Sequence, residues 1–165
     1  MKTEMKITIG TVCFVLDNTN NKILLLKRKN EPMQNLFTGV GGKTEFKEDI
    51  NSSCIREIKE ETGLNVDKVN LKGILKTILE GKNSSWILFV YTTASFIGNV
   101  MDCNEGELIW INKKDVFSKN LIDFIRRILP SVLKENEFIE GTIIHDAKGN
   151  VIKETLNINS SLDII

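Results

Sequence analysis

A short segment of the sequence gathers acidic side chains around one arginine. Residues 41–64 read GGKTEFKEDINSSCIREIKEETGL. Four of its glutamates, Glu48, Glu57, Glu60 and Glu61, flank Arg56. An α-helix turns about 100° per residue, so Glu57, Glu60 and Glu61 would share one arc of a helix. Like charges at this spacing destabilise an isolated helix by about 0.2–0.5 kcal/mol, whereas clustered carboxylate oxygens are what Mg²⁺ binds. The spacing therefore predicts a divalent-cation site.

The end of this acidic stretch has the sequence pattern of a helix C-cap. We expect a helix over Glu48–Thr62, with the carboxylates along one margin of its buried stripe and so at the edge of a cleft. Gly63 follows where a left-handed residue is favoured, and Leu64 supplies the apolar contact that accompanies such a cap. A charge run on a helix is more often a solvated face, but the flanking glycines and the single arginine favour a site.

A glycine-rich stretch precedes the helix. Its glycines are Gly39, Gly41 and Gly42. They allow the backbone to approach a ligand or a metal closely, and Lys43 beside them is a point charge for phosphate. Arg56 lies one turn before Glu60 and can orient it. These features together predict hydrolysis of a metal-bound oligophosphate.

Length and composition predict one compact domain over residues 1–165. Acidic and basic residues balance at 22 each, which argues against a nucleic-acid polymer as partner. Cys13, Cys54 and Cys103 show no metal or disulfide spacing, so we expect them to be reduced and structural. No apolar run approaches the roughly 20 residues of a membrane helix, and the N-terminus lacks a signal-peptide pattern. We therefore expect a cytoplasmic protein that does not contact membranes.

The remaining pattern alternates strands and helices. Predicted strands cover Ile7–Asp17, Ile23–Lys27, parts of Leu64–Glu80, Trp86–Phe96 and Glu107–Asn112, with a further hairpin over Phe138–Leu156. An amphipathic helix starts at Leu121 and is expected to end at Pro130. Trp110 is expected in the core and His145 on the surface, without a role.

The acidic segment resembles the Nudix box, G-x5-E-x7-R-E-U-x-E-E-x-G-U, where U is aliphatic. The matching residues are Gly42, Glu48, Arg56, Glu57, Ile58, Glu60, Glu61, Gly63 and Leu64, without a mismatch over 23 positions. This resemblance implies an α/β protein, the Nudix α/β/α sandwich around a central mixed β-sheet. It also implies hydrolysis of a nucleoside diphosphate linked to another group.

The resemblance further implies roles for individual residues. The carbonyl of Gly41 and the side chains of Glu57, Glu60 and Glu61 would hold Mg²⁺ or Mn²⁺, and Arg56 would hold the acids in place. Family members often add an acid from a loop before a later strand, and Glu105 stands there, with Glu107 the less favoured choice. The catalytic base is Glu105, Glu57 or Glu60; spacing does not separate them.

Beyond the box, the chain is similar to the MutT-type branch, which converts damaged purine nucleoside triphosphates such as 8-oxo-dGTP to the monophosphate and pyrophosphate. The substrate would contact Gly42 and Lys43, and Arg28 would reach phosphate. Phe37 either stacks on a base or packs in the core. Thr38 stands where relatives place an asparagine for the base, which is a departure from that branch.

The sequence leaves three other functions open. The first is hydrolysis of a dinucleoside polyphosphate or an ADP-sugar, whose usual proline or tyrosine marks are absent after the box. The second is a non-catalytic nucleotide-binding regulator, which would be expected to have lost a box glutamate. The third is an RNA-cap hydrolase, which would favour a more basic surface. The partner is expected to be a small nucleotide, and the protein a monomer or a homodimer.

Overall fold

The protein is described by a computed structural model, which covers residues 4–160. Its elements, in chain order, are β1 (Lys6–Asp17), β2 (Lys22–Arg28), β3 (Phe37–Thr38), α1 (Ile50–Thr62), β4 (Asn70–Leu79), β5 (Ser84–Thr93), β6 (Gly106–Asn112), the 3-10 helix η1 (Lys113–Ser118), α2 (Asp123–Val132), β7 (Glu137–His145) and β8 (Val151–Ser160). No helix within residues 4–160 is long and apolar enough to cross a bilayer.

All eight strands join one mixed sheet. Its order is β3-β2-β1-β5-β4-β7-β8, and β6 pairs with β2. The hairpins β1–β2, β4–β5 and β7–β8 are antiparallel, whereas β1–β5 and β4–β7 are parallel. Because the two parallel pairs join segments far apart in the chain, the sheet brings its N-terminal and C-terminal parts together.

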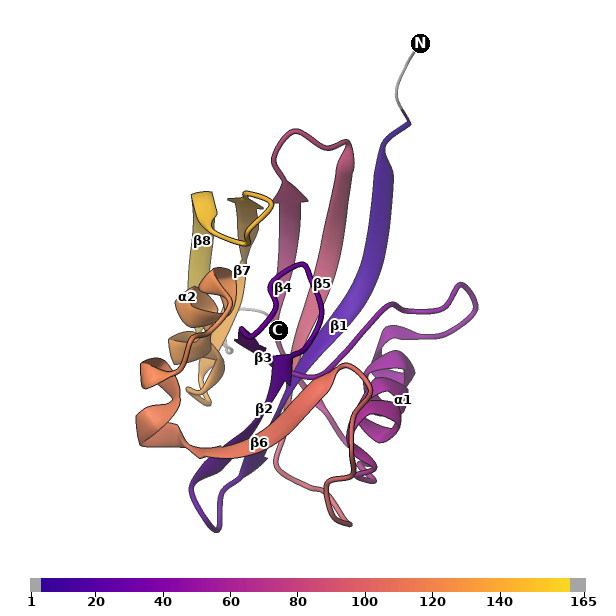
Figure 1. The fold of residues 1–165 in the computed structure, drawn as a ribbon, viewed down its shortest axis with the longest axis vertical. Coiled ribbons are helices and arrows are strands. Elements are labelled where there is room, and N and C mark those ends of the chain that lie inside the picture. The colour runs from indigo at the N-terminus through magenta and orange to yellow at the C-terminus, as the bar shows by residue number, and fades with distance from the viewer. Residues whose placement is uncertain (1–3, 161–165) are drawn as a thin grey trace.

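The two faces of the sheet carry separate apolar cores because side chains alternate along each strand. Along β1, Val12 and Phe14 face one way, and Cys13 and Val15 face the other; all four are nearly inaccessible to solvent. The first core packs against α2 and the second against α1, and Figure 1 shows the two helices on either side of the sheet. The expected sandwich around a mixed sheet is confirmed.

Three helix boundaries differ from the sequence prediction, and one of them is the start of α2, which lies at Asp123 and not at Leu121. Helix α1 begins at Ile50 and not at Glu48, because Asp49 caps it by accepting from the backbone N–H of Ser52 at 2.9 Å. Helix α2 continues through Pro130 to Val132. Proline removes one backbone donor near the C-terminal end of this helix, and burial of Ser131 and Val132 against the core retains the last turn.

Burial elsewhere matches expectation in part. Trp110 is only partly buried; it packs against the α1-side core and lies 5.5 Å from the Phe96 ring. His145 ends β7 half-buried and not on the open surface. The three cysteines are free, and Cys13 and Cys54 are fully enclosed.

The predicted cap of α1 is confirmed and can be tested. Gly63 has φ 78°, and its N–H donates to the carbonyl of Lys59 at 3.0 Å. A Cβ at this position would also lie 2.5 Å from the sulfur of Met101. We expect Gly63→Ala to lower the free energy of unfolding by about 1–2 kcal/mol in urea titrations, mainly through left-handed strain, because the exposed Met101 side chain can move away.

A matched control separates these two contributions. Gly81 has φ 74°, but a Cβ added there would meet no atom within 4 Å. Gly81→Ala should therefore cost only the left-handed strain, about 1 kcal/mol. Equal losses in the two variants would show that the Met101 contact contributes nothing.

Candidate active site

Arg56 is the centre of the acidic cluster. Its Nε and Nη2 donate to the two carboxylate oxygens of Glu48 at 2.7 and 2.9 Å. Its Nη1 donates to Glu57 at 2.9 Å and to Glu60 at 3.0 Å. A fifth bond, 3.1 Å long, runs from Nη2 to the carbonyl of Lys43. The planar guanidinium thus fixes three carboxylates and the glycine-rich stretch relative to one another.

This network sets the charge of Glu48. The Arg56 hydrogen bonds lower the pKa of the Glu48 carboxyl to about 2, and the same contact raises the pKa of Arg56 above its ordinary value. Glu48 precedes the helix and reaches forward to Arg56 from the loop. It is therefore a permanently ionised anchor and not a candidate for proton transfer.

Glu61 is more buried than a residue at a cleft edge would be. Its relative exposure is 8%, and the N–H of Gly41 donates to its Oε2 at 2.9 Å. Burial is the main cause that raises its pKa, to about 8, while the Gly41 bond acts in the opposite direction and the neighbouring Glu105 and Glu57 raise it further. The carboxylate is held in place at a cost that a nearby cation would remove.

The loop before β6 brings Glu105 to the same place. Its carboxyl is close enough to Glu61 to hydrogen-bond with it, and it also raises the pKa of Glu57. The loop is anchored to β2 because the N–H of Lys29 donates to the Glu105 carbonyl at 3.0 Å. Glu105 therefore lies near Glu57 and Glu61, although it is more than forty residues away in the chain.

Glu57 lies between the helix and the glycine-rich stretch. Its side chain is 14% exposed, against 58% for Glu60. A Cβ on Gly42 would lie 2.6 Å from Glu57 Oε1, so only glycine lets the carboxylate lie against this backbone. Burial raises the pKa of Glu57; Arg56 lowers it, and Glu60 and Glu105 raise it. The Glu57 carboxylate therefore lies directly against the glycine-rich backbone.

The donor set fits a hard divalent cation. It consists of carboxylate oxygens, which are ligands preferred by Mg²⁺ and Mn²⁺, and the mutual repulsion of Glu57, Glu61 and Glu105 is what such a cation offsets. Within residues 4–160, no three acidic, histidine or cysteine side chains form a ready coordination shell. Arg56 binds one oxygen each of Glu57 and Glu60, which leaves the other oxygen of each available.

Comparison with known proteins places this geometry in a family. The family model of the NUDIX domain matches residues 7–132. The chain belongs to the Nudix family.

The similarity to individual Nudix proteins extends over most of the chain. A crystal structure of a mutator MutT protein from Bacillus halodurans superimposes with a TM-score of 0.82, is 29% identical, and aligns over 91% of this chain and 97% of that one. The Nudix hydrolase YvcI of Bacillus subtilis is 29% identical over 143 residues, which are 84% of this chain and 89% of the relative. These matches make the protein a Nudix hydrolase of MutT-like structure.

A third relative matches only a short region. The ADP-ribose pyrophosphatase of Methanocaldococcus jannaschii is 47% identical over 55 residues, which cover 33% of this chain and 32% of the relative. The identity is high, but the match covers only a third of either chain. It supports the family more than it supports a shared substrate.

The residues predicted to contact substrate lie at different positions relative to the acidic cluster. Arg28 lies at the end of β2 opposite Gly106, next to the Glu105 loop, and its Nε donates to the Pro32 carbonyl at 3.2 Å. Thr38 lies on β3, opposite Leu26, and is half-buried. Gly42 lies against the Glu57 carboxylate. Their contacts with a nucleotide stay predictions.

Phe37 requires a correction. The side chain is 9% exposed and belongs to the core between the sheet and α2. Its backbone explains this placement, because its N–H donates to Asn120 and its carbonyl accepts from Ile122, which tie β3 to the start of α2. A ring buried in this way offers little surface to a base, and we do not propose base stacking for it.

Two contacts at the site were missed by sequence reasoning. The Lys43 ammonium lies 5.9 Å from the centre of the Trp86 ring, a cation–π distance. The Gly41 N–H bond to Glu61 was also missed. Neither contact has a local signal, because each joins segments brought together only by the fold.

Proposed function

We propose that the protein hydrolyses nucleoside triphosphates to the monophosphate and pyrophosphate, with Mg²⁺ or Mn²⁺ held by Glu57, Glu60, Glu61, Glu105 and the carbonyl of Gly41. The observation that carries the proposal is the set of Glu57, Glu61 and Glu105 around the glycine-rich stretch, with Glu61 buried. A folded protein retains such a costly cluster where it has a use. The MutT-like structure supports a triphosphate as substrate.

The chain's own residues supply the positions and the base. The bound cation would neutralise phosphate charge and lower the pKa of a water molecule. Arg56 keeps the carboxylates in register. Lys43 directly follows the glycine-rich stretch and Arg28 ends β2 beside the Glu105 loop, so both are proposed as cations for phosphate oxygens. The base must have a free oxygen, which Glu57 and Glu60 both keep, and Glu57 also has a raised pKa. Glu57 is therefore favoured over Glu60, with Glu105 as the other candidate.

Hydrolysis of an ADP-sugar is the second candidate function. It is favoured by one observation, the match to an ADP-ribose pyrophosphatase over 55 residues. A regulator that binds nucleotide without hydrolysis is disfavoured, because every box glutamate is present and Arg56 holds three of them in place.

A substrate panel tests the proposal. The purified protein is incubated in Mg²⁺ with the common and 8-oxo nucleoside triphosphates, ADP-ribose and diadenosine polyphosphates, and products are resolved by ion-exchange chromatography. We expect monophosphate and pyrophosphate from a triphosphate, and no turnover in EDTA.

Other product patterns would contradict the proposal in distinct ways. AMP and ribose phosphate from ADP-ribose, with triphosphates unchanged, would establish the second candidate. Nucleotide binding by calorimetry without any product would indicate a regulator.

A further inference from the structure

One face of the sheet is only partly covered by the chain itself. Rows of cross-strand neighbours follow from the register: Ile9, Ile87, Lys76, Thr142 and Thr155 form one row, and Ile7, Ser85, Ile78, Ile144 and Lys153 the next. By strand alternation these rows lie on the α1 side, the side of Cys13 and Tyr91. Figure 1 shows α1 beside the lower part of β1 only. The upper part of this face is open.

The part of the open face over β1, β4 and β5 carries several isoleucines that are not fully buried. Ile7 is 55% exposed and Ile9 is 44% exposed, and Ile74, Ile78 and Ile87 are only half-buried. Strand positions with this alternation normally pack on another layer, and a contiguous apolar patch on a soluble protein normally marks an interaction surface.

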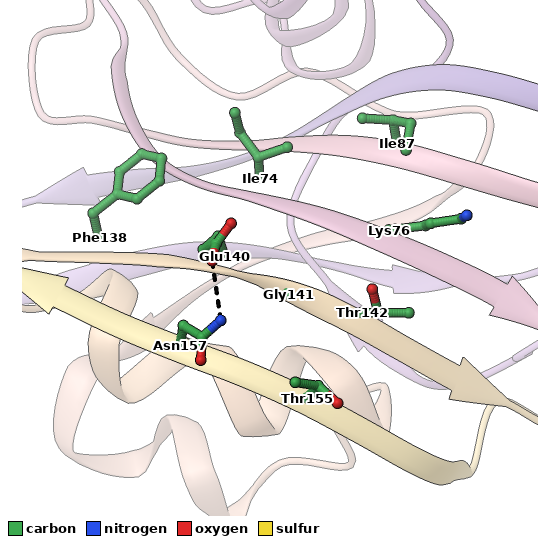
Figure 2. Close-up of a pocket in the computed structure, with 9 residues that line it drawn as sticks. All are labelled: Ile74, Lys76, Ile87, Phe138, Glu140, Gly141, Thr142, Thr155 and Asn157. Carbon is green, nitrogen blue, oxygen red and sulfur yellow. Dashed lines mark hydrogen bonds between the residues drawn. The ribbon is translucent and has the colours of Figure 1, made fainter. Parts of the chain in front are cut away.

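A hollow of about 380 Å³ lies at one end of this face. Figure 2 shows the side chains around it: Ile74, Ile87 and Phe138 are apolar, and Lys76 and Glu140 contribute opposite charges. Glu140 accepts from the amide of Asn157 at 3.0 Å. Lys76 makes no ion pair in the part of the chain described. The hollow is lined about equally by apolar and polar groups, because Thr142, Thr155 and Asn157 line it together with the two charged side chains.

Phe46 and its two neighbours in the chain have features that complement the hollow. Its side chain is 100% exposed, in the loop between the glycine-rich stretch and α1. The loop is anchored on both sides, because the Thr44 N–H donates to the carbonyl of Ile9 and the Glu45 N–H donates to the Glu48 carboxylate. An acid, Glu45, and a base, Lys47, flank the ring. Anchoring the loop holds an aromatic side chain in water at the β1 edge of the open face.

We propose that this face is the interface of a homodimer, in which Phe46 of each copy enters the hollow of the other. A twofold axis near Ile9 and Ile87 would place the Phe46 ring of each copy at the hollow of the other, so that the same contact forms twice, as in any self-complementary interface. Glu45 would meet Lys76 of the second copy, and Lys47 would meet Glu140. A buried aromatic anchor in a pocket is the usual energetic centre of such interfaces. The match of one exposed ring and two flanking charges to one charged hollow favours a second copy of this chain as the occupant.

Sedimentation velocity on the full chain, over a micromolar concentration series, tests the inference. We expect a dimer, and we expect Phe46→Ala to raise its dissociation constant by at least about tenfold. Ile97→Ala is the control, because Ile97 is 76% exposed on a different loop and should leave association unchanged. Circular dichroism and thermal melts establish that each variant is folded.

A charge exchange then tests the orientation. Lys76→Glu should weaken the dimer, and adding Glu45→Lys should restore it in part, since the two charges would face each other again. A monomeric wild-type chain would overturn the inference and leave the face to another occupant. A dimer that is unaffected by both Phe46→Ala and Lys76→Glu would overturn it equally, because the interface would then lie elsewhere.

Discussion

Replacing Glu61 by glutamine should remove most turnover while making the metal-free protein more stable at alkaline pH. The carboxylate is buried and faces Glu105 and Glu57, so its loss deprives the proposed cation of a charged ligand. We expect the rate to fall by about 10²–10⁴-fold. The shape is conserved, because the glutamine oxygen can still accept from the N–H of Gly41.

The stability effect follows from the raised pKa of Glu61. A carboxyl whose folded pKa is about 8, above its ordinary 4.5, contributes stability that is full below pH 4.5 and is lost as the pH rises toward 8. The glutamine variant lacks this loss. In EDTA, the difference in unfolding free energy between variant and wild type should therefore grow between these two pH values, which urea titrations at several pH values will measure.

Added Mg²⁺ should reverse the order of stabilities. Wild type should gain thermal stability from Mg²⁺ at pH 8, because the cation binds the ionised cluster, and the variant should gain less. Glu107→Gln is the matched control, since Glu107 is exposed on β6 and pairs across to Lys27. A Glu61→Gln enzyme with wild-type rate, or a wild type indifferent to Mg²⁺, would exclude the proposed site.

The box and its helix were predictable because their signals are local. The arc of Glu57, Glu60 and Glu61, the left-handed Gly63 and the bridging position of Arg56 all follow from helix geometry within one segment. Glu105 was reachable only through the family resemblance, since no local rule relates a loop acid to a distant helix. Its proximity to Glu61 depends on the pairing of β6 with β2.

Burial was harder to predict, because it depends on what packs against each residue. Phe37 directly precedes the glycine-rich stretch, yet the contacts of β3 with the start of α2 turn its ring into the core. Ile7 and Ile9 show the converse. Their alternation indicates a buried strand face, but the sequence does not say whether the covering layer belongs to the same chain. The structure leaves both residues exposed.

The charge of Arg56 is not sufficient for its role, and Arg56→Lys should show this. Lysine keeps the positive charge but cannot make the five bonds that join Glu48, Glu57, Glu60 and the Lys43 carbonyl. We expect a loss of stability of about 1–3 kcal/mol, reduced from a fully buried pair because the side chain is 26% exposed. The turnover number should fall by about a hundredfold.

The steady-state constants distinguish positioning from simple destabilisation. Every donor that Arg56 uses faces the protein itself, so the variant should retain its KM for nucleotide while kcat falls and the affinity for Mn²⁺, measured by electron paramagnetic resonance, weakens. Arg127→Lys is the matched control on α2, where Arg127 pairs with Asp123 and Glu154 at 3.3 and 3.1 Å, and it should change neither constant. If stability falls while kcat and the Mn²⁺ affinity stay unchanged, Arg56 is a purely structural residue. The carboxylates would then hold their positions without it.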